Sequence, residues 1–416
     1  MRGGDTAWML IATALVLFMT PGLAFFYGGM VRSKHMLGML MQNFFAMGLL
    51  AVLWVTVVFS LAFGGAGNGG VIGSLDHLGM HHVTQSASVL APTIPFILFA
   101  AYQMTFAIIT PALITGATAD RLKFSAYAVF IGLWLVFVYA PVAHWVFAGG
   151  WLAKRGALDF AGGAVVHINA GAAALAVVLV IGPRRGHGRE PMPPHSLPWT
   201  LIGTGILWFG WAGFNGGSAL AANGVAAQAL MNTFVAASAA MLGWLLIERV
   251  RGGHATTLGG ASGAVAGLVA ITPCAGYVST MPALLIGFSV GMVCYLALTI
   301  KARCKLDDAL DVIAVHLVGG LYGSIVLGLF ADHDVNPVVA HEGLLLGGGG
   351  RLIGEQVLAS VTTLAFSFTA SWLLAKVIDA VIGLRISAAQ EDEGMDLALH
   401  AETAYAFGDF GSTRRG

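Results

Sequence analysis

The sequence predicts an all-α polytopic membrane protein, and its composition and the length of its apolar runs support this class. Of 416 residues, 57% are hydrophobic and 10% are charged, with a mean hydropathy of +0.83, whereas soluble domains carry about 25% charged residues. Apolar runs of about 20 residues, the length that crosses a bilayer as a helix, recur along the chain. The ~10-residue alternating segments of a transmembrane barrel are not evident.

Eleven apolar segments are laid out along the chain as candidate transmembrane helices. The first of them follows only Arg2 and Asp5, and its apolar run continues toward Arg32, so we expect a retained span rather than a cleaved signal peptide. Residues 1–383 thus form a membrane domain, and the polar residues 384–416 form a cytoplasmic tail. The spans cover residues 7–31, 38–63, 93–118, 124–147, 162–182, 198–217, 226–247, 256–274, 281–300, 309–330 and 351–381.

The distribution of Lys and Arg predicts the orientation, because these residues stay mainly in cytoplasmic loops. With the N-terminus outside, sixteen of the 20 basic residues fall on the inner side. The four that remain outside are Arg2, Lys154, Arg155 and Arg351. The opposite orientation would invert this ratio, so we predict an N-out, C-in chain.

Five spans followed by five more predict an inverted repeat, because an odd number of crossings reverses the second half relative to the first. Repeat one would cover about 7–182 and repeat two about 198–330, with helix eleven (about 351–381) added. Short motifs recur at matching places: Tyr27–Gly29 with Asn215–Gly217, and Ile109–Pro111 with Ile271–Pro273.

Two intramembrane histidines occupy repeated settings. His167 follows Asp159 by eight residues, His316 follows Asp308 by eight, and a glycine comes four residues after each histidine. An ionisable group inside a membrane segment is a functional hypothesis by default, although a lone histidine is often neutral and simply hydrogen-bonded. The repeated pair predicts one site built by both halves of the chain, in which imidazoles accept or pass protons.

Asp159 is placed at the outer N-terminus of a helix, where it would cap backbone N–H groups and help to draw cations in. On a regular helix it would lie about 12 Å from His167 along the axis. No cysteine or carboxylate stands three or four residues after either histidine, so we expect no metal and no cofactor. The flanking apolar residues offer no nucleophile, which disfavours an enzyme, and the zero net charge gives no reason to expect nucleic acid.

The stretch Asp159–Gly171 resembles the signature of the ammonium transporter family, the Amt/Mep/Rh group, and fits the Amt branch best. The likeness runs from the first span into the tail. Further stretches that resemble family motifs are Pro21–Gly29, Gly210–Asn215, Asp311–His316, Arg385–Ser387 and Glu393–Asp396.

The resemblance implies a homotrimer of eleven-helix subunits, each with its own pore and a regulatory C-terminal tail. It implies that ammonium, with methylammonium also tolerated, is recruited outside and deprotonated. Ammonia then crosses a hydrophobic pore, with co-movement of the proton. The resemblance also implies a cytoplasmic PII-type signalling partner. A bacterial-type plasma (inner) membrane is expected from the short tail and the absence of an organelle-targeting segment.

The resemblance also implies roles for single residues. His167 and His316 look like the twin pore histidines, and Phe106 and Phe214 look like the aromatic gate above them. The remaining matches are Ser218 as the hydroxyl of the outer ammonium site, Asp159 as the acidic residue near it, and Trp211 and Thr272 as pore-adjacent residues.

One position departs from the family pattern. The outer site usually includes a tryptophan where this chain has Phe147, with Trp145 two residues earlier. A cation is held less well over Phe than over Trp, so we expect weaker recruitment of ammonium or help from another aromatic such as Tyr102. An ammonium sensor that signals through its tail stays open as a second function.

Overall fold

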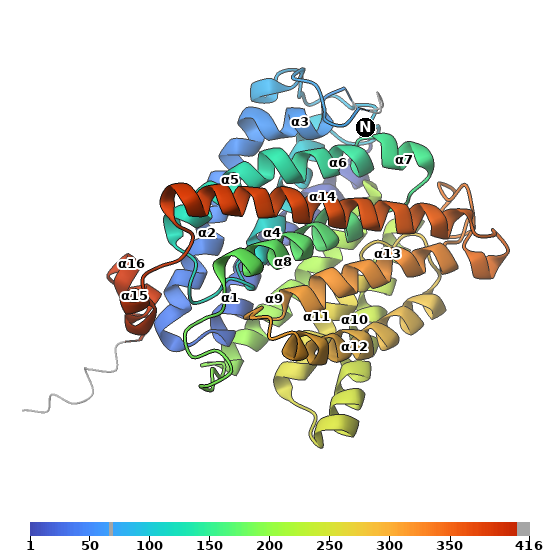
Figure 1. The fold of residues 1–416 in the computed structure, drawn as a ribbon. Coiled ribbons are helices and arrows are strands. Elements are labelled where there is room, and N and C mark those ends of the chain that lie inside the picture. The colour runs from blue at the N-terminus through green and yellow to red at the C-terminus, as the bar shows by residue number, and fades with distance from the viewer. Residues whose placement is uncertain (66–69, 406–416) are drawn as a thin grey trace, which may run out of the picture.

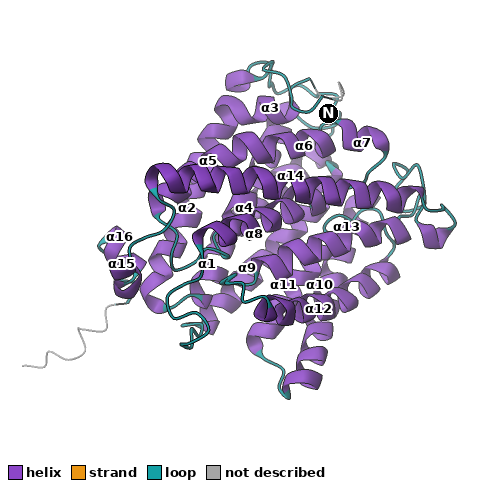
Figure 2. Ribbon diagram, in the orientation of Figure 1, coloured by secondary structure: helices purple, strands orange, loops and turns teal. Residues whose placement is uncertain are grey.

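The computed structural model describes residues 1–65 and 70–405, and no β-strand is present in these two ranges, as Figure 2 shows. The confirmed class is therefore the predicted one, an all-helical protein. The last part of the predicted tail, with Arg414 and Arg415, lies outside the described residues, as does part of the outer loop between the second and third spans.

The first half of the chain forms five helical segments, some of them divided by a short π-helical turn. In order these are α1 (Gly3–Met30); α2 (Met36–Leu53), η2 (Trp54–Val58) and α3 (Phe59–Phe63); α4 (Phe96–Ile114); α5 (Phe124–Trp134), η4 (Leu135–Tyr139), α6 (Ala140–Phe147) and α7 (Trp151–Arg155); and η5 (Gly163–Ile168) with α8 (Asn169–Ile181).

The second half forms six long segments and a folded tail. In order these are α9 (Leu197–Gly216), α10 (Gly224–Gly252), α11 (Thr257–Ile271), α12 (Thr280–Arg303), η7 (Ile313–Val318) with α13 (Gly319–Phe330), α14 (Arg351–Ile382), and the tail helices α15 (Ala388–Glu393) and α16 (Met395–His400). Short 3₁₀ turns lie between them at Ser33–His35, Leu78–Met80, Gly217–Ala219 and Leu344–Leu346.

Eleven helical segments thus coincide with the eleven predicted spans. Within the described ranges, nine of them are long and apolar enough to cross a membrane. The other two are α9 and α11, and α11 has only 15 residues. A polytopic membrane protein is shown, and the count of eleven crossings stays a prediction.

Helices of the first half of the chain pack directly against helices of the second half. α1 lies along α9, α10 lies against α11 and α12, and α14 crosses α8 and α13 on the outside of the bundle (Figure 1). Small residues permit the closest approaches, as is usual between membrane helices. A Cβ on Gly203 of α9 would lie 2.2 Å from the backbone nitrogen of Phe26 in α1, so this crossing requires glycine.

Candidate functional site

The two intramembrane histidines meet at the centre of the bundle. His316 Nδ1 lies 3.3 Å from His167 Nδ1, and the imidazole rings stack with centroids 5.3 Å apart and planes at 22°. Both are almost fully buried, with 1% and 4% of their surface exposed. Because two Nδ1 atoms face each other, one must carry the hydrogen and the other must accept it. The pair is therefore polarised, with one proton shared along a defined line.

Each histidine lies in a π-helical turn at the start of its helix, His167 in η5 and His316 in η7. The regular helix that the sequence analysis assumed between Asp159 and His167 is wrong: the helix begins only at Gly163, and Gly162 before it has a φ of +121°. A π turn inserts an extra residue into the helix and is frequent at functional sites. Here it turns the imidazole of each helix toward that of the other.

The glycine that follows each histidine by four residues lets the two broken helices touch. A Cβ on Gly171 would lie 2.5 Å from the backbone nitrogen of Leu317, and a Cβ on Gly320 would lie 3.0 Å from Cβ of His167. Each glycine thus faces the histidine segment of the other half. This reciprocal contact is the physical reason for the repeated spacing in the sequence.

A small, almost wholly apolar cavity adjoins the histidine pair. Its volume is about 10 Å³, close to the minimum that holds a single water-sized molecule. His167, His316 and the Trp211 and Phe214 rings line it together with aliphatic side chains of α1, α4, α9 and α11. The only polar atoms that such a lining offers are those of the imidazoles and the indole.

The predicted gate residues lie together beside this cavity. The Phe106 and Phe214 rings have centroids 4.3 Å apart and are tilted by 40°. Trp211 stacks on His167 with centroids 5.6 Å apart, and its Nε1 donates a hydrogen bond of 3.0 Å to Thr272 Oγ1. Trp211 and Thr272 therefore hold the imidazole of His167 in place from the side.

Hydroxyl groups and carbonyls gather on the other side of the phenylalanines. The Tyr102 hydroxyl lies 3.2 Å from Ser218 Oγ and within hydrogen-bonding distance of the carbonyls of Gly213 (2.9 Å) and Phe214 (2.8 Å). Ser218 Oγ donates to the Phe214 carbonyl at 2.8 Å. Among the described residues, Phe147 is half-buried at the end of α6 and makes no ring contact with Phe106.

Asp159 caps the first histidine helix. Its two carboxylate oxygens accept four backbone N–H bonds of 2.6 to 3.2 Å, from Gly162, Gly163, Ala164 and Val165. Because both oxygens are occupied in this way, any effect of Asp159 on a cation comes through its charge and through the placement of η5. Asp308 holds the corresponding place in the second half, accepting from the backbone of Val312 (3.1 Å) and Ile313 (2.7 Å).

A second cavity of about 10 Å³ lies on the inner side of His316. Tyr27, Ser262 and Asp311 line it, and His316 and Phe26 belong to both cavities. Asp311 has a φ of +63° and forms an ion pair with Lys301. In the sequence, Asp311 stands out only as part of the stretch Asp311–His316. Its place in the lining of this cavity depends on its left-handed backbone conformation, which the sequence does not predict.

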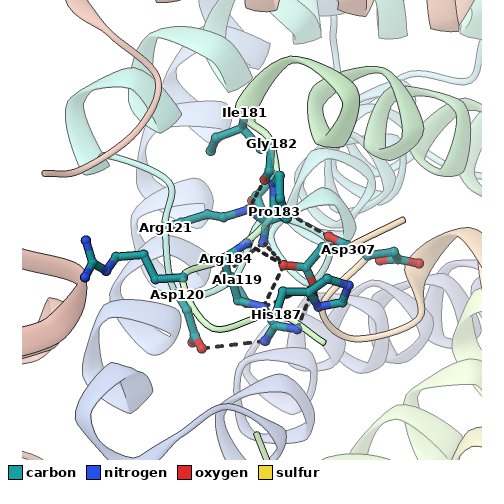
Figure 3. Close-up of polar contacts among 12 residues, drawn as sticks. Ala119, Asp120, Arg121, Ile181, Gly182, Pro183, Arg184, His187 and Asp307 are labelled. Carbon is teal, nitrogen blue, oxygen red and sulfur yellow. Dashed lines mark hydrogen bonds and ion pairs between the residues drawn. The ribbon is translucent and has the colours of Figure 1, made fainter. Parts of the chain in front are cut away.

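A buried charge network that the sequence did not predict lies at the end of the bundle that the charge distribution assigns to the cytoplasm. Arg184 lies between Asp307 and Asp120 (Figure 3), with Nη2 2.8 Å from Asp307 Oδ1, its backbone nitrogen 2.6 Å from Asp307 Oδ2, and Nη1 3.6 Å from Asp120 Oδ2. Arg121 lies 3.9 Å from Asp307 and His187 lies 3.2 Å from it. The signal in the sequence that could have indicated this network is the position of its charged residues, which lie directly at the ends of predicted spans.

The charges in this network stabilise one another strongly. Burial by itself would raise the pKa of Asp307, but the hydrogen bonds of Arg184 and the charge of Arg121 more than offset burial and hold the pKa at about 2. Burial lowers the pKa of Arg121 to about 10. Both groups therefore stay ionised at neutral pH, and Arg184 links the two halves of the chain through Asp120 and Asp307.

The tail folds back onto the cytoplasmic ends of the helices. Glu391 of α15 is buried, where it accepts a hydrogen bond of 2.7 Å from Arg385 Nη2 and another of 2.7 Å from the Arg185 backbone. Asp396 of α16 accepts a hydrogen bond of 2.8 Å from the Gly38 backbone at the start of α2. The described part of the tail is thus docked on α2 and on the segment that joins the two repeats.

No group of three or more His, Cys, Asp or Glu side chains within residues 1–65 and 70–405 is arranged to hold a metal ion. In the first cavity the two histidines are accompanied by aromatic and aliphatic side chains, and in the second His316 is accompanied by Ser262 and Asp311.

Comparison with known proteins shows the family of the chain. A sequence model described as the Ammonium Transporter Family matches residues 7–405. The chain is 52% identical to an "Ammonium transporter" of Mycobacterium tuberculosis, covering 97% of this chain and 91% of that protein. It is 46% identical to "Ammonium transporter Amt1" of Archaeoglobus fulgidus, covering 97% of this chain and 100% of that protein.

Solved structures show the same fold. Mep2 of Saccharomyces cerevisiae superposes with a TM-score of 0.87 at 36% identity, covering 93% of this chain and 91% of that chain. A protein described as "Sensor Amt Protein" superposes with a TM-score of 0.88 at 28% identity, covering 95% and 98%. Sequence and structure agree over nearly the whole chain, and the chain belongs to the ammonium transporter family.

Proposed function

We propose that this protein takes up ammonium across the plasma membrane by recruiting the cation outside, deprotonating it and conducting neutral ammonia. The observation that carries the proposal is the stacked His167/His316 pair beside an apolar cavity that holds about one small molecule. Its relatives carry transporter names rather than enzyme names, in agreement with a non-enzymatic role.

The low polarity of the pathway argues for a neutral species at its centre. An isolated ammonium-type ion without compensating partners would cost on the order of tens of kcal/mol by simple solvation estimates in such a medium. Ammonia has no net charge, and its N–H groups and lone pair can be hydrogen-bonded by an imidazole that both donates and accepts. The histidines thus lower the barrier for ammonia while the phenylalanines exclude water.

The proposed path runs through the named residues in order. Tyr102 and Ser218 supply oxygen atoms, and Phe106 and Phe147 supply aromatic faces, for the outer cation. Ammonium loses one proton there, and ammonia passes Phe214. The proton moves along the 3.3 Å contact between the two imidazoles. Ammonia regains a proton inside, where Asp311 is the carboxylate that lines the exit.

The test is the current that follows an ammonium concentration jump in proteoliposomes on a solid support. The proposal expects a saturable transient current from the wild-type chain and none from protein-free liposomes. His316→Leu removes the proton relay and should abolish the current. His254→Leu, at an exposed position between α10 and α11, is the matched control and should leave the current intact.

Two results would change the mechanism. A full wild-type current from His316→Leu would defeat the relay. Rapid alkalinisation of the liposome lumen without current would mean neutral ammonia transport without proton co-movement. Uptake of methylammonium by the same liposomes would establish the expected tolerance for that substrate.

A sensor is the second candidate function, because a structure described as "Sensor Amt Protein" has the same fold at 28% identity. The docked tail is the element that would report occupancy of the pore. Ammonium binding with neither current nor alkalinisation would favour this function over transport.

The proposal includes assembly and partners. A homotrimer in a bacterial-type inner membrane is expected for the family, with a PII-type signalling protein as the cytoplasmic partner. Light scattering of the detergent-solubilised protein tests the trimer. Co-purification that changes with nitrogen supply tests the partner.

A further inference from the structure

A larger cavity lies apart from the histidine pathway, at the end of the molecule that the orientation analysis places outside. Its volume is about 470 Å³. It is lined by residues from the C-terminal ends of α6 and α7, the segment 156–159, Tyr277, the loop 338–341 and the first two residues of α14. The proposed transport mechanism uses none of this space.

Basic side chains dominate the polar lining. Lys154, Arg155, His341 and Arg351 all border the cavity. Of these, Arg155 is paired with Glu355 by two hydrogen bonds of 2.9 and 3.0 Å. Within the described ranges, Lys154, His341 and Arg351 have no hydrogen-bond or ion-pair partner from their side chains. The cavity thus presents unpaired donors toward a common space.

This gathering runs against the general distribution of charge. Only four of the 20 Lys and Arg residues lie on the predicted outer side, and three of the four border this one cavity. Basic residues are otherwise kept in cytoplasmic loops. Three unrelated segments, α7, the loop before α14 and α14 itself, supply the basic groups, so sequence proximity does not explain the cluster.

The acidic groups nearby offset only part of this charge, because the carboxylates of Asp159 and Glu355 stand against the three basic groups of Lys154, Arg155 and Arg351. Asp159 borders the cavity, but its oxygens already accept four backbone hydrogen bonds. The carboxylate of Glu355 forms an ion pair with Arg155. In addition, α14 is a 32-residue helix whose N-terminus has no side-chain cap, and its first residues Arg351 and Leu352 line the cavity. Free N–H groups and the helix dipole at such an end favour an anion.

One apolar side chain of the lining is strongly exposed: Val338, in the loop before α14, has 67% of its surface accessible. The cavity therefore opens to the surface of the protein beside its basic side chains.

We propose that this cavity binds a phosphate-type oxyanion, held by Lys154, Arg351 and His341 and by the N-terminus of α14. Two sources carry this chemistry, the phosphodiester of an anionic phospholipid headgroup and free inorganic phosphate. Arg and Lys side chains with helix N–H groups are a typical donor set for phosphate oxygens.

The experiment measures the thermal unfolding midpoint of the full-length, detergent-solubilised protein during titration with three probes. These are inorganic phosphate, dioctanoyl phosphatidylglycerol and dioctanoyl phosphatidylcholine. A ligand that binds only the folded state raises the midpoint in a concentration-dependent way, which yields its affinity. Phosphatidylglycerol or phosphate should raise the midpoint of the wild-type chain, and zwitterionic phosphatidylcholine should have little effect.

The double variant Lys154→Gln/Arg351→Gln should weaken that affinity at least about tenfold, because each charged hydrogen bond contributes about 1.5–3 kcal/mol. The double variant Arg2→Gln/Arg251→Gln removes the same charge at exposed positions away from the cavity and should keep wild-type affinity. All four positions are exposed, so folding of both variants is expected.

The outcomes separate the sources and decide the proposal. A shift with inorganic phosphate that the cavity variant loses assigns the site to the free anion. A shift with phosphatidylglycerol alone, lost in the same variant, assigns it to a lipid headgroup. Equal affinities of the cavity variant and the wild type, or no shift with either anion, would overturn the proposal.

Discussion

At the scale of single residues, the chemistry of the pathway rests on very few polar atoms. His167 and His316 supply almost all of the hydrogen-bonding capacity at the centre of the bundle, and Trp211 holds the first of them through its contact with Thr272. Because the surroundings are apolar, each polar atom has a large effect on which species can pass. Changes at one residue should therefore appear directly in substrate affinity or current.

Phe147 gives the sharpest test at this scale. Phe147→Trp should lower the half-saturating ammonium concentration by up to about fivefold, because a cation is held better over indole than over phenyl by some tenths of a kcal/mol up to ~1. The readout is the concentration dependence of the ammonium-jump current. Phe137→Trp, at a lipid-facing position that is 57% exposed, should show no change. An unchanged or higher value in Phe147→Trp would count against a role for this ring.

The sequence was enough to predict which residues form the candidate site. It was not enough to predict how their side chains are oriented. Two histidines in matching apolar settings are visible as a pattern, since ionisable groups in spans are rare. The π turn that aims each imidazole is not visible, because it depends on how the backbone packs at Gly162 and against the other half. The tilt of Phe106 on Phe214 likewise follows from packing rather than from residue type.

At the scale of elements, charged residues at helix ends fix the segments that carry the histidines. Asp159 and Asp308 cap η5 and η7, and Arg184 joins Asp120 of the first half to Asp307 of the second (Figure 3). Sequence reasoning found the first cap because it stands alone before an apolar run. It missed the Arg184 network, since its members come from loops whose meeting only the fold determines.

The Asp307 network predicts a defined pH dependence. The folded-state pKa of Asp307, about 2, lies below its ordinary value of 3.8, so ionised Asp307 stabilises the fold above about pH 4. This stabilisation is lost as the pH falls from about 4 toward 2. We expect the thermal unfolding midpoint to be insensitive to this group between pH 5 and 7, and the wild type to lose stability below pH 4.

A variant isolates this contribution. Asp307→Asn should lower the unfolding midpoint at pH 7, because it leaves the buried Arg184 and Arg121 with Asp120 as the remaining carboxylate of the network. It should also reduce the loss of stability below pH 4. Asp392→Asn is the control: its ion pair with Arg185 is exposed at both partners (61% and 53%), so little change is expected. Equal midpoints for wild type and Asp307→Asn at pH 7 would contradict this account.

At the scale of the whole molecule, the fold class followed from composition and apolar periodicity, because the bilayer restricts a spanning chain to helices or closed barrels. Pairing between helices was beyond such reasoning, since lipid and helix surfaces are equally apolar and small residues decide the contacts. Gly203 against Phe26 is an example. The docked position of the tail was also not predictable, because its contacts with Gly38 and Arg185 join residues far apart in the chain.

Docking of the tail makes a prediction at this scale. Glu391→Gln weakens the bonds to Arg385 and to the Arg185 backbone, and bonds to charged groups contribute about 1.5–3 kcal/mol each. Amide hydrogen exchange in residues 388–400 should accelerate roughly tenfold or more. Glu393→Gln, two residues away and exposed, should exchange like the wild type. Equal rates in both variants would show that Glu391 does not hold the tail.

The reciprocal glycine contacts have a consequence for how the protein is made. His167 and His316 are 149 residues apart, and ribosomes add roughly 5–20 residues per second, so the first histidine helix enters the membrane about 7–30 s before its partner is synthesised. During that interval Gly171 and His167 lack the surface they finally pack against. Biogenesis must therefore shield a polar imidazole and an unfilled groove from lipid, and chaperoning by the insertion machinery is most needed between these two moments of translation.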